Sequence, residues 1–331
     1  MSEILMEGLQ VRDLRMEDVE AVTDLINQCD QHDLHESNLE VEDMRREWQT
    51  PDLELASNLH AVFDGEKIVA YAERWGISPP YTRIYGFFRV HPSYRERGIE
   101  DYLLHWIEST AREINIPKAP PEARVYLING YDSRMTRELE RLTQHGYSYV
   151  RSFYRMVVTF DGEPKTEPFP EGIELRPFMV ERDLRPVADA LDEAFQDHFG
   201  HTKMDFEKWS HWVLNEPRND FEQWYVAYAG NEIAGVCLCM TDIPEKPNYG
   251  FVEDLAVRRP YRKLGLGTAL LRHAFKGFYQ RGRLGAALGV DSENLTGALR
   301  LYERAGMAPD ETYHRYEKTI REGVELATIT L

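Results

Sequence analysis

The stretch EDLAVRRPYRKLGLGTAL, residues 253–270, is the part of the chain from which the fold can be worked out. The apolar triplet 255–257 predicts a buried strand, and the apolar residues after Thr268 predict an amphipathic helix. Gly265 and Gly267 lie between the two. The first N–H groups of a helix lack intrahelical partners and carry partial positive charge, and glycine lets an anion approach them. The stretch therefore predicts an anion site, although a plain strand–turn–helix connection would also use glycines there.

The turn itself adds positive charge and a recognisable spacing. Its cations stand out in an otherwise acidic chain: Arg258, Arg259, Arg262 and Lys263. The spacing R-x-x-G-x-G is neither a Walker loop nor the dinucleotide-binding G-x-G-x-x-G. Because it directly follows a predicted strand, it resembles the acyl-CoA pyrophosphate loop of the GNAT superfamily of N-acetyltransferases.

A second motif follows at the distance that this superfamily shows. After a predicted strand at 286–290, residues 294–307 read NLTGALRLYERAGM. This segment is similar to the superfamily pattern N-x-x-A-x-x-x-Y-E-x-x-G-F, with Met307 in place of the usual phenylalanine. With two motifs in register, the second half of the chain is identified as a member of the GNAT superfamily.

The resemblance implies acetyl-CoA as the co-substrate and assigns residues to it. The strand backbone would pair with the pantetheine arm and supply an oxyanion N–H, and the turn would hold the pyrophosphate. Asn294 would contact the pantetheine arm, or it would cap the helix that follows. The residues expected at the cofactor are Leu255, Ala256, Val257, Arg262, Lys263, Leu264, Gly265, Leu266, Gly267, Thr268 and Asn294.

Composition limits the classes of function. The 331 residues carry a formal net charge of −18, which argues against nucleic acid and fits either cationic substrates or simple solubility. No apolar run approaches a membrane span, and the first residues lack a signal-peptide layout. No histidine spacing predicts a metal site, and Cys237 and Cys239 alternate along an apolar strand as core residues. We therefore expect a cytoplasmic protein without a metal or a membrane partner.

The order of predicted elements occurs twice, which indicates duplicated domains. Strands alternate with helices and hairpins in each copy, so we expect an α/β fold with a mixed sheet, built as two tandem GNAT domains. The polar, proline-containing stretch 161–172 predicts a linker between a domain at 1–160 and a domain at 173–331. Val90 and Val257 would end equivalent strands in the two copies.

The two copies differ at the positions that matter for chemistry. In the turn, the first copy has Glu100 where the second has Gly267. On the strand before it, Gly86 and Phe87 stand opposite Glu253 and Asp254. In the second motif, Arg134 stands opposite Asn294 and Leu142 opposite Tyr302. A carboxylate beside a pyrophosphate would repel it. The first domain is therefore predicted to be a degenerate copy that serves as scaffold and as one wall of the substrate cleft. This layout resembles tandem GNAT enzymes such as the mycothiol synthases, in which the degenerate copy can still hold CoA.

Acetylation of an amine by a thioester needs a neutral amine, a donor for the oxyanion and a proton for the departing thiolate. Glu253 is the predicted base, because the Glu-Asp pair before the apolar triplet resembles spermidine/spermine acetyltransferases, in which that Glu is a proposed base. Alternation places Glu253 and Leu255 on one face of the strand and Asp254 on the other. A bulge would exchange the two carboxylates, and a purely structural interpretation has both of them pairing at the sheet edge.

Tyr302 is the predicted acid. A phenol holds its proton at neutral pH and can give it to a thiolate. Resembling enzymes place a tyrosine near the thioester sulfur at this point of the motif. The alternative is an aromatic side chain that packs on the cofactor without proton transfer.

The stretch FQDHFGH, residues 195–201, lies where GNAT enzymes build the acceptor pocket. Asp197, His198 and Trp209 are the predicted acceptor contacts, with aromatic packing as the structural alternative. The acidic charge favours a small cationic primary amine, such as an aminoglycoside, a polyamine or an amino sugar. Two alternatives remain open: acetylation of a protein N-terminus or lysine, and a non-catalytic acyl-CoA-binding module.

Overall fold

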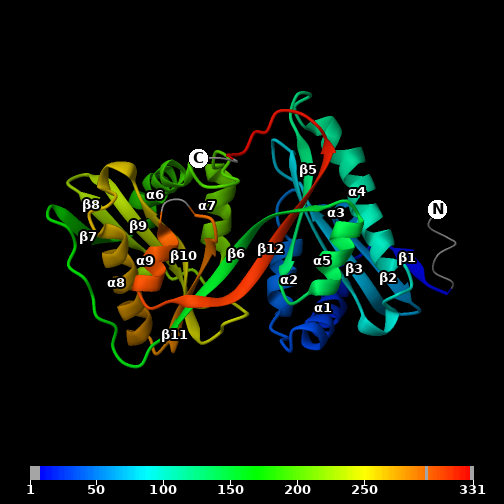
Figure 1. Ribbon diagram of the computed structural model, residues 1–331, viewed down its shortest axis with the longest axis horizontal. Coiled ribbons are helices and arrows are strands. Elements are labelled where there is room, and N and C mark those ends of the chain that lie inside the picture. Colours follow the sequence, from blue (N-terminus) through cyan, green and yellow to red (C-terminus); the bar gives the residue numbers. More distant parts are fainter. Residues whose placement is uncertain (1–7, 295–296, 329–331) are drawn as a thin grey trace. The chain divides into compact units, whose positions relative to one another are not determined.

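The computed structural model describes residues 8–294 and 297–328. The chain forms two compact units, and each has its own layers of helices and strands (Figure 1). The first unit comprises Met1–Ser152 with Tyr313–Leu326, and the second comprises Phe153–Thr312 with Ala327–Leu331. Both units combine helices with a mixed sheet, which confirms the α/β class expected from the sequence.

The first unit is built on strands in the order β1-β2-β3-β4-β5-β12. β4 and β5 are parallel, and the other neighbouring strands are antiparallel. The elements are β1 (Gln10–Arg12), η1 (Met16–Asp18), α1 (Val19–Asp33), α2 (Val41–Trp48), α3 (Leu55–Asn58), β2 (Leu59–Asp64), β3 (Lys67–Trp75), β4 (Arg83–Val90), η2 (Pro92–Tyr94), α4 (Ile99–Lys118), β5 (Val125–Asp132), α5 (Thr136–Gln144), the start of β6 (Ser148–Thr159) and the end of β12 (Ala308–Arg321).

Apolar alternation along the strands explains the two helical layers of this unit. In β2, Ala61 and Phe63 belong to the core cluster that α1 and α2 cover, whereas Val62 belongs to the cluster that α4 and α5 cover on the other face. Successive side chains of a strand point to opposite faces, so a strand with apolar residues in succession needs cover on both sides.

The second unit repeats this plan with strands in the order β6-β11-β10-β9-β8-β7, and β10 and β11 are its parallel pair. α8 and α9 cover one face of the sheet, and α6 and α7 cover the other (Figure 1). The elements are the end of β6, β7 (Ile173–Pro177), α6 (Val180–Phe195), α7 (Phe206–Asn215), η3 (Phe221–Gln223), β8 (Tyr225–Ala229), β9 (Glu232–Met240), β10 (Tyr249–Val257), η4 (Arg259–Tyr261), α8 (Leu266–Gln280), β11 (Gly285–Asp291), α9 (Ala298–Arg304) and the start of β12.

The two neighbouring cysteines lie in the core of the second unit, as their spacing predicts. Cys237 and Cys239 are fully buried free thiols on one face of β9, with their sulfur atoms 3.9 Å apart. They pack in the cluster that α8 covers. Both therefore serve as small apolar side chains.

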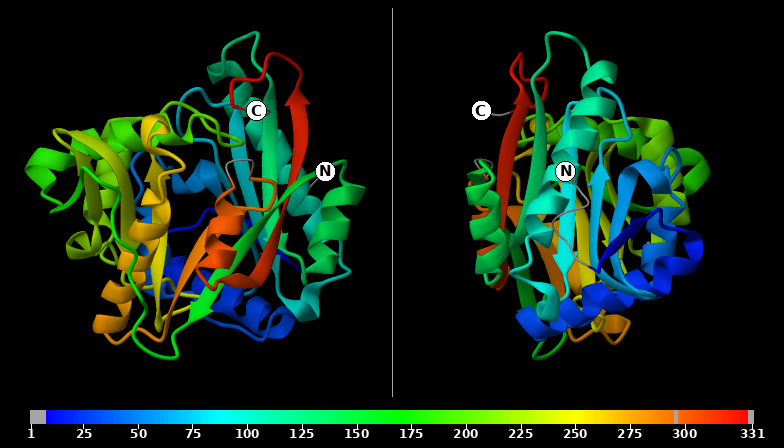
Figure 2. Two further views of the ribbon diagram at one scale, coloured as in Figure 1. Left: turned by 60° about the vertical axis from the view of Figure 1, so that its left-hand side comes forward. Right: turned by 90° about the vertical axis from the view of Figure 1, so that its right-hand side faces the viewer.

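Each unit is completed by a strand that the sequence repeat assigns to the other copy. Phe153–Thr159 of β6 pair with β11 of the second unit. Tyr313–Arg321 of β12 pair with β5 of the first unit, and both views of Figure 2 show the red β12 beside β5. The boundaries 1–160 and 173–331 remain a prediction about the repeat, whereas the compact units divide β6 and β12.

Candidate active site

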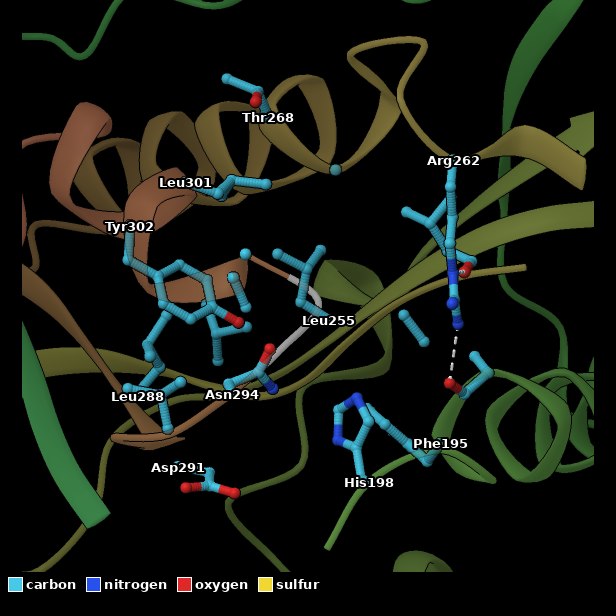
Figure 3. Close-up of a pocket in the computed structure, with 18 of the residues that line it drawn as sticks. Phe195, His198, Leu255, Arg262, Thr268, Leu288, Asp291, Asn294, Leu301 and Tyr302 are labelled. Atoms are coloured by element: carbon cyan, nitrogen blue, oxygen red, sulfur yellow. Dashed lines mark hydrogen bonds between the residues drawn. The ribbon is translucent and has the colours of Figure 1, made fainter. Parts of the chain in front are cut away.

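A cavity opens in the second unit where β10 and β11 diverge. The two strands pair in parallel from Tyr249 and Gly285 to Val252 and Leu288. Beyond this point both strands line a cavity of about 770 Å³, together with α8, α9 and the loop after α6. Figure 3 shows side chains from all of these elements pointing toward one space.

A bulge in β10 determines which carboxylate faces the cavity. The antiparallel register with β9 shifts between Val252 and Asp254, which makes Glu253 the extra residue of the bulge. Glu253 lines the cavity together with Leu255, whereas Asp254 is not part of the lining. The bulge therefore leaves Glu253 on the cavity side and does not exchange the two carboxylates.

The surroundings raise the pKa of both carboxyl groups. Desolvation raises the pKa of Glu253, and the charge of Arg155 on β6 opposes this rise. Desolvation and the nearby charge of Glu253 raise the pKa of Asp254 to about 7. Glu253 is exposed to the open cavity while protein surrounds it on its other sides. A carboxylate with a raised pKa is a better base near neutral pH than an ordinary one.

Tyr302 reaches the same cavity from α9. Only 7% of this residue is exposed, and Figure 3 shows its hydroxyl directed into the space beside Asn294 and Leu255. Desolvation raises the pKa of the phenol, and the charge of the Asp254 carboxylate adds to the rise. The hydroxyl therefore stays protonated at neutral pH.

Arg262 closes the turn that follows β10. Its Nε donates to the Val257 carbonyl at 3.0 Å, and its Nη2 donates to the Ala194 carbonyl at 2.9 Å (Figure 3). In the first unit the Nε of Arg95 donates in the same way to the Val90 carbonyl, at 3.2 Å. Because both copies make this bond, the guanidinium serves first to hold the strand end.

The turn presents its backbone to the cavity. Lys263 and Gly265 adopt left-handed φ values of 64° and 88°, and Gly265 caps α8. At Gly267 an added Cβ would lie 3.1 Å from Cδ1 of Leu301, so α8 starts close beneath α9. Leu264 is 57% exposed and lies outside the cavity lining, contrary to expectation. The other residues expected at the cofactor all line the cavity: Leu255, Ala256, Val257, Arg262, Lys263, Gly265, Leu266, Gly267, Thr268 and Asn294.

Asn294 lies in a turn and is not a helix cap. Its N–H donates to the Asp291 carbonyl at 3.1 Å. Helix α9 begins at Ala298, and Gly297, with a φ of 80°, occupies the capping position. The capping interpretation of Asn294 is therefore wrong, because the helix starts later than its apolar pattern indicates. Residues 295–296 of the predicted helix lie outside the described residues.

His198 is the predicted acceptor contact that does line the cavity. It follows α6, and its ring lies edge-on to Phe195 with centroids 4.6 Å apart. Desolvation lowers the pKa of His198, and the charge of Arg262 lowers it further. The imidazole is therefore neutral at pH 7 and can both donate and accept a hydrogen bond.

Two predicted acceptor contacts, Asp197 and Trp209, lie outside the cavity lining. Asp197 accepts a hydrogen bond from Nε of Arg259 at 3.2 Å and lies 3.7 Å from Arg262. These arginines balance its charge, and the Arg259 bond lowers the pKa of its carboxyl group. Trp209, on α7, is half-buried and packs against the core cluster, with its ring 6.4 Å from Trp224. This contact fits the aromatic-packing alternative for Trp209.

The cavity also contains residues that the motifs did not single out: Phe153, Phe199, Gly289, Val290 and Asp291. Phe199 belongs to the FQDHFGH stretch and could have been included by its position. Phe153 carried no such signal, because it lies on the strand that the repeat assigns to the first copy.

The described residues contain neither a side-chain group suited to a metal ion nor a helix suited to a membrane span. Within 8–294 and 297–328, the His, Cys, Asp and Glu side chains form no group of three that could hold a metal ion. The helices of the same residues are too short or too polar to cross a bilayer.

Comparison with known proteins identifies the family. Residues 184–307 match the family model "Acetyltransferase (GNAT) family". A crystal structure of a GCN5-related N-acetyltransferase from Sphaerobacter thermophilus is 31% identical, covers 98% of this chain and 99% of that one, and superposes with a TM-score of 0.82. The chain therefore belongs to the GCN5-related N-acetyltransferase (GNAT) family.

More distant similarities agree in fold and extend to curated proteins. A tandem GNAT protein from the clavulanic acid biosynthesis pathway has a TM-score of 0.72 at 14% identity, over 96% of this chain and 100% of that one. N-alpha-acetyltransferase 30 of Xenopus laevis is 31% identical over 93 residues, which is 28% of this chain and 34% of that protein. The human protein of the same name matches equally over 25% of its length. The chain thus spans about a third or less of these curated relatives.

Proposed function

We propose that this chain is an N-acetyltransferase that moves an acetyl group from acetyl-CoA directly to a primary amine, in the cavity of the second unit. One observation carries the proposal: Glu253, Tyr302 and the turn before α8 line one cavity. A base, an acid and an anion-binding turn are the parts that acyl transfer from a CoA thioester needs from a protein. Membership of the GNAT family supports the same class of reaction.

The residues of the cavity fit acetyl-CoA, which supplies the thioester carbon that the amine attacks. Backbone N–H groups at the start of α8 would hold the pyrophosphate, and Lys263 would add charge. The backbone of Leu255 would pair with the pantetheine arm and donate to the oxyanion. Gly289 leaves room beside this path, because an added Cβ there would meet no described atom within 4 Å.

Glu253 would accept the proton of the attacking amine, either directly or through water. An ammonium group cannot attack, so this transfer must precede or accompany bond formation. The raised pKa of Glu253 suits the task near neutral pH. Asp254, outside the lining, would keep the electrostatic surroundings of the base and not meet the substrate.

Tyr302 would give its proton to the departing sulfur. Burial raises the pKa of the phenol, so the proton is present at working pH and is available to the charge that develops on the sulfur as it departs. A direct transfer of this kind needs no protein nucleophile. The buried Cys237 and Cys239 therefore stay outside the reaction.

The acceptor that we propose is a small cationic amine of aminoglycoside, polyamine or amino-sugar type. The tandem layout that we propose for the chain resembles that of the mycothiol synthases. Glu253 and Asp291 place carboxylates at the cavity, and Phe153 and Phe199 add aromatic faces. Carboxylates and aromatic faces both attract ammonium groups. The formal charge of −18 would also concentrate cations around the protein.

A second candidate acceptor is a protein N-terminus. The similarity to N-alpha-acetyltransferase 30, 31% identical over 93 residues, favours it. A "Probable N-acetyltransferase san" of Drosophila melanogaster is also similar, 26% identical over 95 residues. Such an acceptor would bring an extended backbone as well as an amine, so it needs a peptide and not a single amino group.

The test is a screen in which a thiol reagent detects the CoA that is released from acetyl-CoA. The panel contains spermidine, an aminoglycoside, glucosamine and N-terminal peptides, with each compound also tested in its N-acetylated form. We expect a small cationic amine to stimulate release and its acetylated form to be inert. Stimulation by peptides alone would select the second candidate. Tight acetyl-CoA binding with no stimulation by any amine would favour a non-catalytic acyl-CoA-binding module.

A further inference from the structure

The first unit contains the same parallel strand pair as the second, but its β4 is regular. β4 and β5 pair in parallel from Arg83 and Tyr126 to Tyr85 and Ile128. The antiparallel register of β4 with β3 runs without a shift, so β4 lacks the bulge that places Glu253 at the cavity of the second unit.

Two side chains of β5 bridge the space beyond this pairing. The hydroxyl of Tyr131 accepts the Phe88 N–H at 3.1 Å and donates to the Phe88 carbonyl at 3.3 Å. Nδ2 of Asn129 donates to the Gly86 carbonyl at 2.8 Å. Tyr131 is 2% and Asn129 is 1% exposed. Side chains therefore engage β4 backbone groups on the side facing β5.

An ion pair fills the start of α4. Glu100 lies in the first turn of this helix and is 3% exposed. Its Oε1 accepts a hydrogen bond from Nη2 of Arg137 at 2.5 Å, and Arg137 also pairs with Glu96 in the turn. Glu96 and Gly98 have the left-handed φ values of 66° and 76° that mark the same turn in the second unit. The backbone of an anion-binding turn is thus present, with a carboxylate of the same chain at its centre.

An Asx turn after β5 and β11 fixes how the two units correspond. In each unit an aspartate Oδ1, of Asp132 or of Asp291, accepts the N–H of the second residue after it. Tyr131 therefore corresponds to Val290 and Asn129 to Leu288. This alignment places Arg134 opposite Glu293, whereas counting from the ends of the helices places Arg134 opposite Asn294.

The charged pair has its counterparts at two glycines. Glu100 corresponds to Gly267 through the equivalent turns, and Arg137 corresponds to Gly297, counted back from the glycines that end α5 and α9. All four counterparts line the cavity of the second unit: Gly267, Leu288, Val290 and Gly297. Positions whose side chains fill space in the first unit thus border the open cavity in the second unit.

We propose that the first unit is a closed copy of the acetyl-CoA site, so that the chain binds one acetyl-CoA. Asn129, Tyr131 and the Glu100–Arg137 pair occupy the space that acetyl-CoA takes in the second unit. Val290 and Gly297 are correspondingly residues that keep the second site open. This inference rests on the function proposed above for the second unit.

The primary test is calorimetric titration of acetyl-CoA into the full chain. One site per chain is expected. Two sites would overturn the closed copy and leave the proposed function intact, whereas no site at all would overturn both. The titration is then repeated with Tyr131→Phe, which removes the hydroxyl that bridges to Phe88. This variant is expected to melt at a lower temperature with unchanged stoichiometry and affinity, because no acetyl-CoA is expected to bind in the closed copy.

A second pair of variants transfers the closure to the second unit. Val290→Tyr copies Tyr131 and is expected to weaken acetyl-CoA binding at least tenfold while the chain stays folded. Val324→Tyr is the matched control, because Val324 is 59% exposed in the first unit and the substitution adds the same ring. A folded Val290→Tyr variant that binds acetyl-CoA like the control would overturn the inference, as would an altered affinity in Tyr131→Phe.

Discussion

At the scale of single residues, the charge of Arg155 tunes Glu253. Arg155 lies over the ring of Phe251, with its guanidinium carbon 4.9 Å from the ring centroid, and its charge lowers the pKa of Glu253 against the desolvation that raises it. The proposed base works only when deprotonated, so we expect activity to fall as pH drops through this pKa. We therefore expect Arg155 to extend activity toward lower pH.

Replacing Arg155 tests this assignment. Arg155→Leu removes the positive charge, so the pKa of Glu253 rises and the acidic limb of the kcat/KM profile moves to higher pH. Arg155→Lys keeps the charge and should leave the limb near its wild-type position. A limb that stays in place in Arg155→Leu would exclude Glu253 as the titrating base.

Tyr302 is tested by removing one oxygen atom. Tyr302→Phe keeps the ring in its core cluster but deletes the proton donor. Turnover is expected to fall by about 10²-fold, because a positioned acid contributes that much or more. Acetyl-CoA affinity, measured by calorimetry, should hardly change. Wild-type turnover in this variant would mean that Tyr302 only packs against the cofactor.

The ionised carboxylate of Asp254 lowers the stability of the folded chain. Its pKa is raised to about 7, so between its ordinary value and pH 7 the folded chain binds more protons than the unfolded chain. Stability from this group is present at low pH and is lost as pH rises through about 7. Asp254→Asn should therefore be more stable than wild type at pH 8, by about 1–3 kcal/mol, with little difference at pH 4. Thermal melts at the two pH values measure this, and an equal gain at both would refute it.

At the scale of elements, the start of α8 depends on a residue without a side chain. Gly267→Glu copies Glu100 of the first unit, and its carboxylate would stand where the turn offers N–H groups to a phosphate. We expect acetyl-CoA affinity to fall at least 100-fold in calorimetry. Gly267→Ala is the control for steric effects, because its Cβ meets the flexible end of Leu301 at 3.1 Å and makes an ordinary contact with Cγ2 of Val257 at 3.6 Å. Equal affinities in the two variants would mean that charge at this helix start does not matter.

The turn before α8 also shows how one element serves two purposes. Arg262 and Arg95 use the same nitrogen atom to hold the last carbonyl of the preceding strand, so this part of the motif is structural in both copies. The two copies differ at the helix start, where the second has Gly267 and the first has the Glu100–Arg137 pair. A motif can thus persist for its geometry after its ligand chemistry has gone.

At the scale of the whole molecule, the two units depend on each other for a closing strand. Residues 1–160 expressed alone would lack Tyr313–Arg321, and residues 173–331 would lack Phe153–Thr159. An exposed sheet edge and an uncovered core would result in each case. We expect neither fragment to show a cooperative thermal transition by circular dichroism, and we expect co-expression to restore one.

The control is a chain cut only between 161 and 172, which leaves both closing strands attached to their flanking elements. This nicked protein should stay folded and bind acetyl-CoA. A fragment 173–331 that melts cooperatively and binds acetyl-CoA by itself would show that the exchanged strand is dispensable.

The sequence by itself determined the family and the mixed α/β class, and it predicted residues that the structure gathers around one cavity. These rest on local signals: the turn motif of 262–267 fixes a strand–turn–helix geometry, and ten of the eleven residues expected at the cofactor line one cavity. The tertiary structure decided the features that depend on partners distant in the chain. It set Glu253 at a bulge, paired Asp197 with Arg259, packed Trp209 against Trp224, and brought Phe153 to the cavity. A bulge and the pairing of a closing strand both depend on a neighbouring strand that is distant in the chain, so neither could be obtained from local pattern.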